Sequence, residues 1–99
     1  MSYKVWIDPI VIVEAQATPG NVRQRIKQAM KALANDPRPP DSEELHWPPR
    51  HFEPRRIQIH RWRIIYAVDD DARWVWILAV RKRPPYDYGD LNALLDRIR

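Results

Sequence analysis

Cysteine is absent from this 99-residue sequence, and no stretch of it stays apolar for long. The absence of cysteine excludes disulfide bonds and the common cysteine-based zinc sites. No apolar run approaches the roughly 20 residues that a membrane-spanning helix needs. The first residues carry Asp8 and Glu14 and lack a basic leading region, so no signal peptide is predicted. We therefore expect a cytoplasmic protein that does not enter a membrane.

Proline, in contrast, is abundant, and six of the ten prolines lie between residues 37 and 54. They are Pro37, Pro39, Pro40, Pro48, Pro49 and Pro54. Because proline lacks a backbone N–H and fixes φ, this segment is predicted to be a connector, neither a helix nor a central strand. Its apolar residues are expected to anchor it on the core: Leu45, Trp47 and Phe52. Arg50 and His51 could face a functional site, although a solvated loop is the simpler interpretation.

Basic side chains outnumber acidic ones, 17 against 13, which gives a net charge of +4 and a pI near 9.8. This balance favours a polyanionic partner, either nucleic acid or an acidic protein segment, over charge that serves solubility alone. The length suits a single domain over residues 1–99, with one core of helices packed on a sheet.

The chain is predicted to begin with a short strand at residues 3–7, followed by a short helix. Asp8 can cap a helix whose first position is Pro9, and the sequence Thr18-Pro19-Gly20 ends it, so the helix is expected over residues 9–17. Because residues 10–13 are all β-branched, a strand is the alternative for this segment.

A second helix is predicted from Gly20-Asn21 to Asn35-Asp36. Its apolar residues recur at helical spacing: Val22, Ile26, Ala29, Met30 and Leu33. Basic residues occupy the rest of its surface, and for these we favour solvated charges over contact with nucleic acid.

Residues 55–83 are predicted to form strands that end in arginines. Ile57 and Ile59 alternate with polar neighbours, and the same period of two continues from Trp62 to Val68. Tight turns are predicted near residues 60–61 and at the acidic residues 69–71. The last strand, residues 73–80, runs into three basic residues: Arg81, Lys82 and Arg83. An antiparallel meander is the expected arrangement.

A terminal helix is predicted after Pro84-Pro85, beginning at about Leu91. Its apolar stripe consists of Leu91, Leu94, Leu95 and Ile98. The predicted fold class is therefore α+β: a small antiparallel sheet packed against two N-terminal helices, with a C-terminal helix.

Arginines at several strand ends predict a phosphate-binding site, because a guanidinium is always charged and can grip paired oxygens. RNA can be cut without a metal when its own 2′-OH attacks the adjacent phosphate. Such a site needs groups that clamp and stabilise charge, for which Arg56, Arg63 and Arg83 are the candidates. His60 is the chemical candidate for the proton acceptor, although a simple turn residue is an equal interpretation. Further RNA contacts are expected from Gln58, Arg61, Arg81 and Lys82.

No metal or cofactor is expected. His46, His51 and His60 lack the spacing of metal ligands, and residues 69–71 fit a turn better than a cation site.

Three segments carry a resemblance to a known family: NDPRP at residues 35–39, RRIQIHRWRIIYAV at residues 55–68 and WILAVRKRPPYDY at residues 76–88. In their order and spacing, over nearly the whole chain, they resemble the RelE/ParE superfamily of bacterial and archaeal toxins. The RelE branch implies a toxin of a type II toxin–antitoxin system, a ribosome-dependent endoribonuclease that cleaves translated mRNA. A cognate antitoxin would hold it inactive, with an acidic or apolar segment over the basic surface and assembly into a heterotetramer.

The resemblance also assigns roles to single residues. Arg63 matches the catalytic arginine of the second strand in this region, and Arg83 matches the arginine at the end of the last strand. Tyr86 or Tyr88 matches a C-terminal tyrosine. Arg56 and Gln58 fall where RelE-type enzymes often carry two basic residues. Gln58 departs from that pattern because it cannot carry a charge.

Two other functions are compatible with the sequence. A ParE-like protein would poison DNA gyrase without cutting RNA. A non-catalytic module would bind RNA or antitoxin only.

Overall fold

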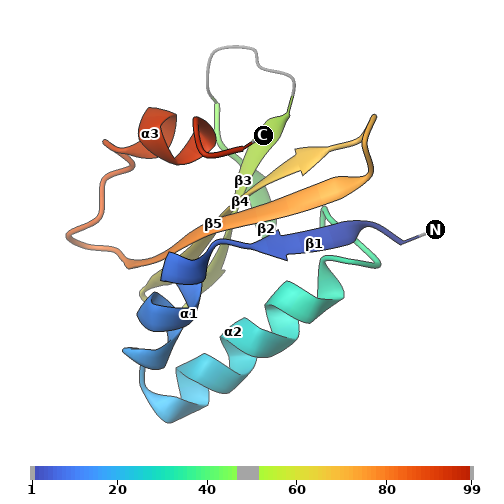
Figure 1. Ribbon diagram of the computed structural model, residues 1–99. Coiled ribbons are helices and arrows are strands. Elements are labelled where there is room, and N and C mark those ends of the chain that lie inside the picture. The colour runs from blue at the N-terminus through green and yellow to red at the C-terminus, as the bar shows by residue number, and fades with distance from the viewer. Residues whose placement is uncertain (1, 47–51, 99) are drawn as a thin grey trace.

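Five strands form one sheet in the order β1-β5-β4-β3-β2 in the computed structural model, which describes residues 2–46 and 52–98 (Figure 1). The strands are β1 (Lys4–Ile7), β2 (Ser42–Glu44), β3 (Glu53–Ile59), β4 (Trp62–Asp69) and β5 (Trp74–Lys82). The helices are α1 (Pro9–Gln16), α2 (Gly20–Ala32) and α3 (Leu91–Leu95). The predicted α+β class is confirmed. In the part of the chain just given, no helix is long and apolar enough to cross a membrane.

The antiparallel meander β3-β4-β5 forms with the predicted turns. The edge strand β1 departs from a purely antiparallel sheet: it runs parallel to β5, from Lys4 opposite Trp74 to Ile7 opposite Ile77. The pairing of β1 with the last strand joins segments about 70 residues apart, so no local signal indicated it. Its consequence is that α1, which follows β1 directly, lies beside β5.

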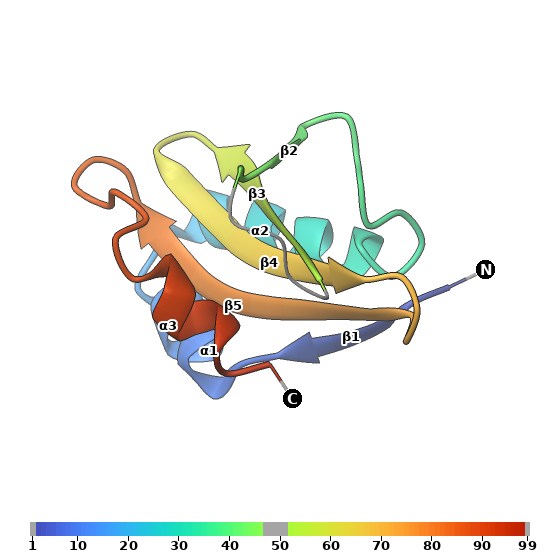
Figure 2. The ribbon, with the colours of Figure 1, turned by 90° about the horizontal axis from the view of Figure 1, so that it is seen from above.

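Helices α1 and α2 lie on one face of the sheet and α3 lies on the other, as Figures 1 and 2 show. Each face carries its own apolar layer. The layer beneath α1 and α2 includes Ile57, Ile59, Ile64, Tyr66 and Val80 of the sheet. The layer beneath α3 includes Ile65, Ala67, Leu78 and Ala79. Since side chains alternate along a strand, the polar residues between the isoleucines of β3 and β4 must project from the α3 face.

The segment after β1 is a helix, not the alternative strand. Asp8 caps it through an Oδ1 that accepts the backbone N–H of Ile10 at 3.0 Å, and Pro9 occupies the first turn. The β-branched run does not produce a one-sided helix: Val11 is buried, whereas Ile12 and Val13 are 54% and 61% exposed. Capping and the following Thr18-Pro19 therefore define α1 better than its hydrophobic pattern does.

Residues 37–54 were expected to contain no central strand, and this is wrong at the C-terminal end of the segment. β2 is a short edge strand within the segment, and Pro54 is the second residue of β3, opposite Ala67 and between β2 and β4 in the sheet order. Proline is tolerated here because β2 pairs with β3 only from Arg55 to Ile57, so the missing N–H lies beyond that ladder. Leu45 and Phe52 pack on the α3-side layer as expected. Trp47, Arg50 and His51 lie outside the described residues.

A charged network fastens this segment to the sheet. Arg38 donates from Nε to Glu53 at 3.2 Å and from Nη2 to Asp70 at 2.8 Å. Burial alone would raise the pKa of Glu53, but hydrogen bonds from Arg55 and Arg38 outweigh it and lower that pKa below its ordinary value. The network lies at the end of the sheet opposite the arginine-rich end of β5.

Candidate functional site

A polar row crosses the three central strands where β3 meets its turn. Gln58 of β3 is paired with Arg63 of β4, and Arg63 is paired with Arg81 of β5. Because paired residues project their side chains from the same face of a sheet, these three belong to the α3 face. Three of the residues predicted for RNA contact or catalysis therefore share one line, although two turns and most of β4 and β5 separate them in sequence.

Arg56 extends this row toward β2. It pairs with Glu43 of β2 through a close guanidinium–carboxylate contact, and its Nη1 lies 3.5 Å from the side-chain oxygen of Gln58. Glu43 was not predicted, because nothing in the proline-rich segment marks it as a strand residue. Its carboxylate partly neutralises Arg56, and being 69% exposed, it can be displaced by a stronger anion.

Arg63 is held by neutral hydrogen-bond acceptors. Its Nη1 donates at 3.3 Å to two backbone carbonyls, those of His60 and Trp62, and its Nε is buried without a partner. Within residues 2–46 and 52–98, Arg63 forms no ion pair. An arginine that is held by neutral acceptors, and whose charge no described carboxylate neutralises, is suited to bind a phosphate.

Arg81 is bound differently. Its Nε donates to Glu14 of α1 at 2.6 Å, and its Nη1 donates to Asp90 at 3.1 Å. Its guanidinium also lies 5.4 Å from the ring centre of Tyr86. Because its guanidinium is already bound by two carboxylates and an aromatic ring, Arg81 is not free to bind RNA in this arrangement.

The end of β5 carries two exposed cations, Lys82 and Arg83. The backbone N–H of Arg83 donates to the carbonyl of Arg61 at 2.7 Å, which brings the β3–β4 turn against the end of β5. The Arg83 guanidinium lies 5.2 Å from the ring centre of Tyr88. Neither Lys82 nor Arg83 is paired with a carboxylate among the residues that the structure describes.

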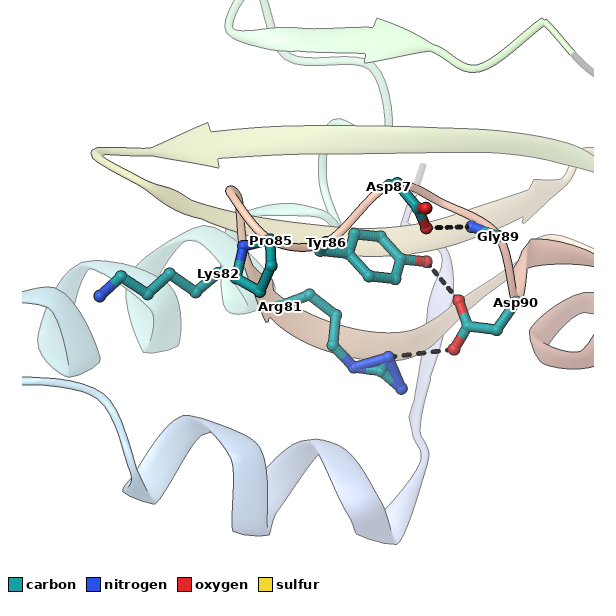
Figure 3. Close-up of a pocket in the computed structure, with 7 residues that line it drawn as sticks. All are labelled: Arg81, Lys82, Pro85, Tyr86, Asp87, Gly89 and Asp90. Carbon is teal, nitrogen blue, oxygen red and sulfur yellow. Dashed lines mark hydrogen bonds and ion pairs between the residues drawn. The ribbon is translucent and has the colours of Figure 1, made fainter.

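Tyr86 and Tyr88 pack edge to face with their ring centres 4.9 Å apart. The Tyr86 hydroxyl donates to Asp90 Oδ1 at 2.6 Å. Burial, together with this hydrogen bond to a carboxylate, raises the pKa of Tyr86 well above its usual value of 10. The phenol therefore stays protonated at neutral pH, and its proton points to Asp90. Figure 3 shows the contacts of Asp90 with Tyr86 and Arg81. An open pocket of about 560 Å³ lies beside them, lined also by Lys82, Pro85 and Asp87.

His60 does not join this group. It has a positive φ of 54° at the turn, and its Nε2 lies 2.9 Å from Nη1 of Arg25 in α2. A guanidinium can only donate, so the imidazole accepts at Nε2 and carries its proton on Nδ1. Its ring therefore contacts the helix layer, on the side of the sheet away from Arg56 and Arg63. Among the described parts of the chain, no three His, Cys, Asp or Glu residues are grouped as metal ligands.

Comparison with known proteins gives one matching family and several similar structures. The family described as the ParE toxin of type II toxin–antitoxin systems, parDE, matches residues 7–84. The archaeal RelE in its RelE–RelB complex from Pyrococcus horikoshii has a TM-score of 0.75 at 24% identity, covering 87% of this chain and 100% of that one. No curated relative matches the sequence.

Two bacterial structures are also similar. A chain of the toxin–antitoxin complex RelBE2 from Mycobacterium tuberculosis has a TM-score of 0.66 at 18% identity, covering 84% of this chain and 100% of that one. The isolated RelE toxin of E. coli has a TM-score of 0.65 at 20% identity, covering 99% of this chain and 100% of that one. At such identities the likeness is one of fold.

Proposed function

The chain belongs to the RelE/ParE superfamily, as a member of the ParE toxin family of type II toxin–antitoxin systems, and from this premise we propose that it is a ribosome-dependent endoribonuclease acting on translated mRNA. One observation carries the proposal. Arg63 and Arg83, the two arginines that match catalytic residues of RelE-type toxins, have no carboxylate partner in residues 2–46 and 52–98, whereas Arg81 between them in sequence has two.

Free guanidiniums on a sheet face supply what cleavage by the RNA itself requires. The 2′-oxygen attacks the adjacent phosphorus, the bond to the 5′-oxygen breaks, and the products are a 2′,3′-cyclic phosphate and a 5′-hydroxyl. Negative charge grows on the phosphoryl oxygens during this step, and arginine can bind two of them at once. Arg63 and Arg83 are proposed for this stabilisation, with Arg56 clamping a neighbouring phosphate. Since DNA lacks the 2′-OH, the site would act on RNA alone.

The proton that leaves the 2′-OH needs an acceptor. His60 fits this role poorly, because its Nε2 already accepts from Arg25 and its ring contacts the helix layer. Tyr86 fits it poorly as well, because its proton is committed to Asp90 and its pKa is raised. Lys82, Tyr88 and groups of the ribosome are the remaining candidates. Dependence on the ribosome follows if part of the proton transfer is supplied there.

A cognate antitoxin is the partner that the toxin family implies. We propose that an acidic segment of it lies over Arg56, Arg63 and Arg83, because that face carries cations with few acidic partners of its own. Antitoxin and RNA would then compete for the same guanidiniums.

Primer extension on an mRNA in a purified translation system tests the proposal. We expect wild type to cut only when ribosomes are present, and Arg63→Ala and Arg83→Ala to cut at least about a hundredfold more slowly, as loss of a charge-stabilising donor does elsewhere. Arg73→Ala is the matched control, since Arg73 is an exposed arginine in the β4–β5 turn at the other end of the sheet. It should cut like wild type.

Inhibition of DNA gyrase is the second candidate, favoured by the match to the ParE toxin family. Folded wild-type protein that cuts no RNA with ribosomes, yet inhibits DNA supercoiling by gyrase, would establish it in place of the nuclease. A protein with neither activity would be a binding module only.

A further inference from the structure

Four side chains form a continuous polar chain behind Arg83: Glu14, Arg81, Asp90 and Tyr86. Glu14 of α1 accepts the backbone N–H of Val80 at 2.9 Å through Oε1 and Arg81 Nε at 2.6 Å through Oε2. Arg81 in turn donates to one oxygen of Asp90 at 3.1 Å, and the other oxygen of Asp90 accepts the Tyr86 hydroxyl at 2.6 Å (Figure 3). This series of hydrogen-bonded side chains thus links α1, the end of β5 and the start of α3.

Asp90 does not cap the helix that it precedes. Asp90 is the N-cap residue of α3, yet its side chain makes no capping hydrogen bond. Both of its oxygens are turned instead to Arg81 and Tyr86. Because the Asp90 carboxylate contacts a half-buried phenol and a bound arginine and makes no capping hydrogen bond, we assign it to the contact with those two groups.

The polar chain continues as a stack of aromatic contacts that ends at Arg83. The Tyr86 ring, held by Asp90 on one side, packs edge to face on Tyr88 at 4.9 Å, and Tyr88 lies 5.2 Å from the Arg83 guanidinium. Tyr88 has a positive φ of 63°, a conformation that a tyrosine adopts only when its surroundings hold it there. Arg83 itself has no carboxylate partner in the described ranges 2–46 and 52–98, and the Tyr88 ring is the side chain against which its guanidinium lies.

We propose that Asp90 is a positioning residue: with Arg81 and Glu14 it holds Tyr86 in place, and through Tyr86 and Tyr88 it determines where the guanidinium of Arg83 lies. The functional consequence rests on the proposed nuclease activity, in which Arg83 binds the scissile phosphate. Arg81 is then a support of the site, and does not touch RNA.

The first test is independent of RNA. In NMR spectra of the whole protein, the Tyr88 ring should shift the side-chain protons of Arg83 upfield, and Asp90→Ala should move them toward the values of a free arginine. Amide hydrogen exchange in residues 86–95 should become about tenfold faster, because the segment loses its anchor. The matched control is Asp87→Ala, which removes an exposed carboxylate of the same segment. Within the described residues, this carboxylate accepts one hydrogen bond, from the Gly89 N–H at 2.9 Å. Unchanged Arg83 shifts in Asp90→Ala would overturn the proposal.

The second test measures cleavage in the ribosome system as a double-mutant cycle. Asp90→Ala should lower kcat about tenfold with KM changed less than about threefold, and in the Arg83→Ala background it should have less than about a twofold effect. The same tenfold loss in both backgrounds would mean that Asp90 acts on the fold and not through Arg83, which contradicts the proposal. Wild-type protein that cuts no RNA overturns the proposed nuclease, while the NMR test still decides whether Asp90 positions Arg83.

Discussion

Arg63 of β4 lies directly opposite Arg81 of β5, yet the two guanidiniums have opposite environments. Arg81 is bound by the carboxylates of Glu14 and Asp90, whereas the hydrogen bonds of the Arg63 side chain in the described residues go to backbone carbonyls. Because the charge of Arg81 is neutralised locally, a second cation can stand beside it without strong repulsion. The pair therefore combines one structural arginine with one that is free to bind phosphate.

This division predicts different effects on stability. Arg81→Ala should lower the free energy of unfolding by about 2 kcal/mol, because it leaves two partly buried carboxylates without their cation. Arg63→Ala should change it by less than about 0.5 kcal/mol, because no ion pair is lost. Urea denaturation of both variants at pH 7 measures the difference. Equal losses would contradict the assignment of separate roles.

Replacing Gln58 with a basic residue is expected to strengthen RNA binding. Gln58→Lys adds a cation to the row beside Arg63, so RNA should bind more tightly and with a steeper dependence on salt. For single-stranded RNA, one more phosphate contact steepens the plot of log K against log salt by about 0.7. Fluorescence anisotropy titrations with RNA at about 50 to 200 mM salt measure this slope. Gln28→Lys, on the exposed surface of α2, is the control and should leave the slope nearly unchanged.

Replacing His60 is expected to leave proton transfer in the cleavage reaction unaffected. His60→Gln preserves an acceptor for Arg25, so the cleavage rate should stay within about threefold of wild type at neutral pH, with the same pH profile. The profile is measured by single-turnover cleavage between about pH 5 and pH 8. Loss of the imidazole-dependent limb together with a hundredfold lower rate, about what a general base contributes, would assign His60 the role of base after all.

The Arg38–Glu53 ion pair predicts loss of stability in acid. The folded-state pKa of Glu53 is lowered from its ordinary 4.5, so its contribution is complete above that pH and is lost as the pH falls through the lowered value. Glu53→Gln should therefore cost about 1 kcal/mol at neutral pH, because hydrogen bonds to two arginines are weakened. The cost should shrink below pH 4.5. Denaturation of wild type and variant at neutral and acidic pH tests this, and a pH-independent difference would contradict it.

Local sequence determined most of the secondary structure. Asp8 and Pro9 specify the start of α1, and the period of two in residues 57–68 specifies β3 and β4. These features depend on near neighbours, through capping, turn chemistry and side-chain alternation. The basic strand ends could be predicted for the same reason, because the strand pattern and the family motifs identify Arg63 and Arg83.

Tertiary structure alone decided which of the cations are free. The parallel pairing of β1 with β5 places α1 beside β5, and only then does Glu14 reach Arg81, 67 residues away. Asp90 binds the same arginine from the far side of a turn, and Arg25 turns His60 toward the helix layer from 35 residues away. The sequence by itself thus determined the strands, the helices and the supply of positive charge. The packing of distant segments determined how that charge is used, because ion pairs and buried phenols depend on distances in space that no local pattern encodes.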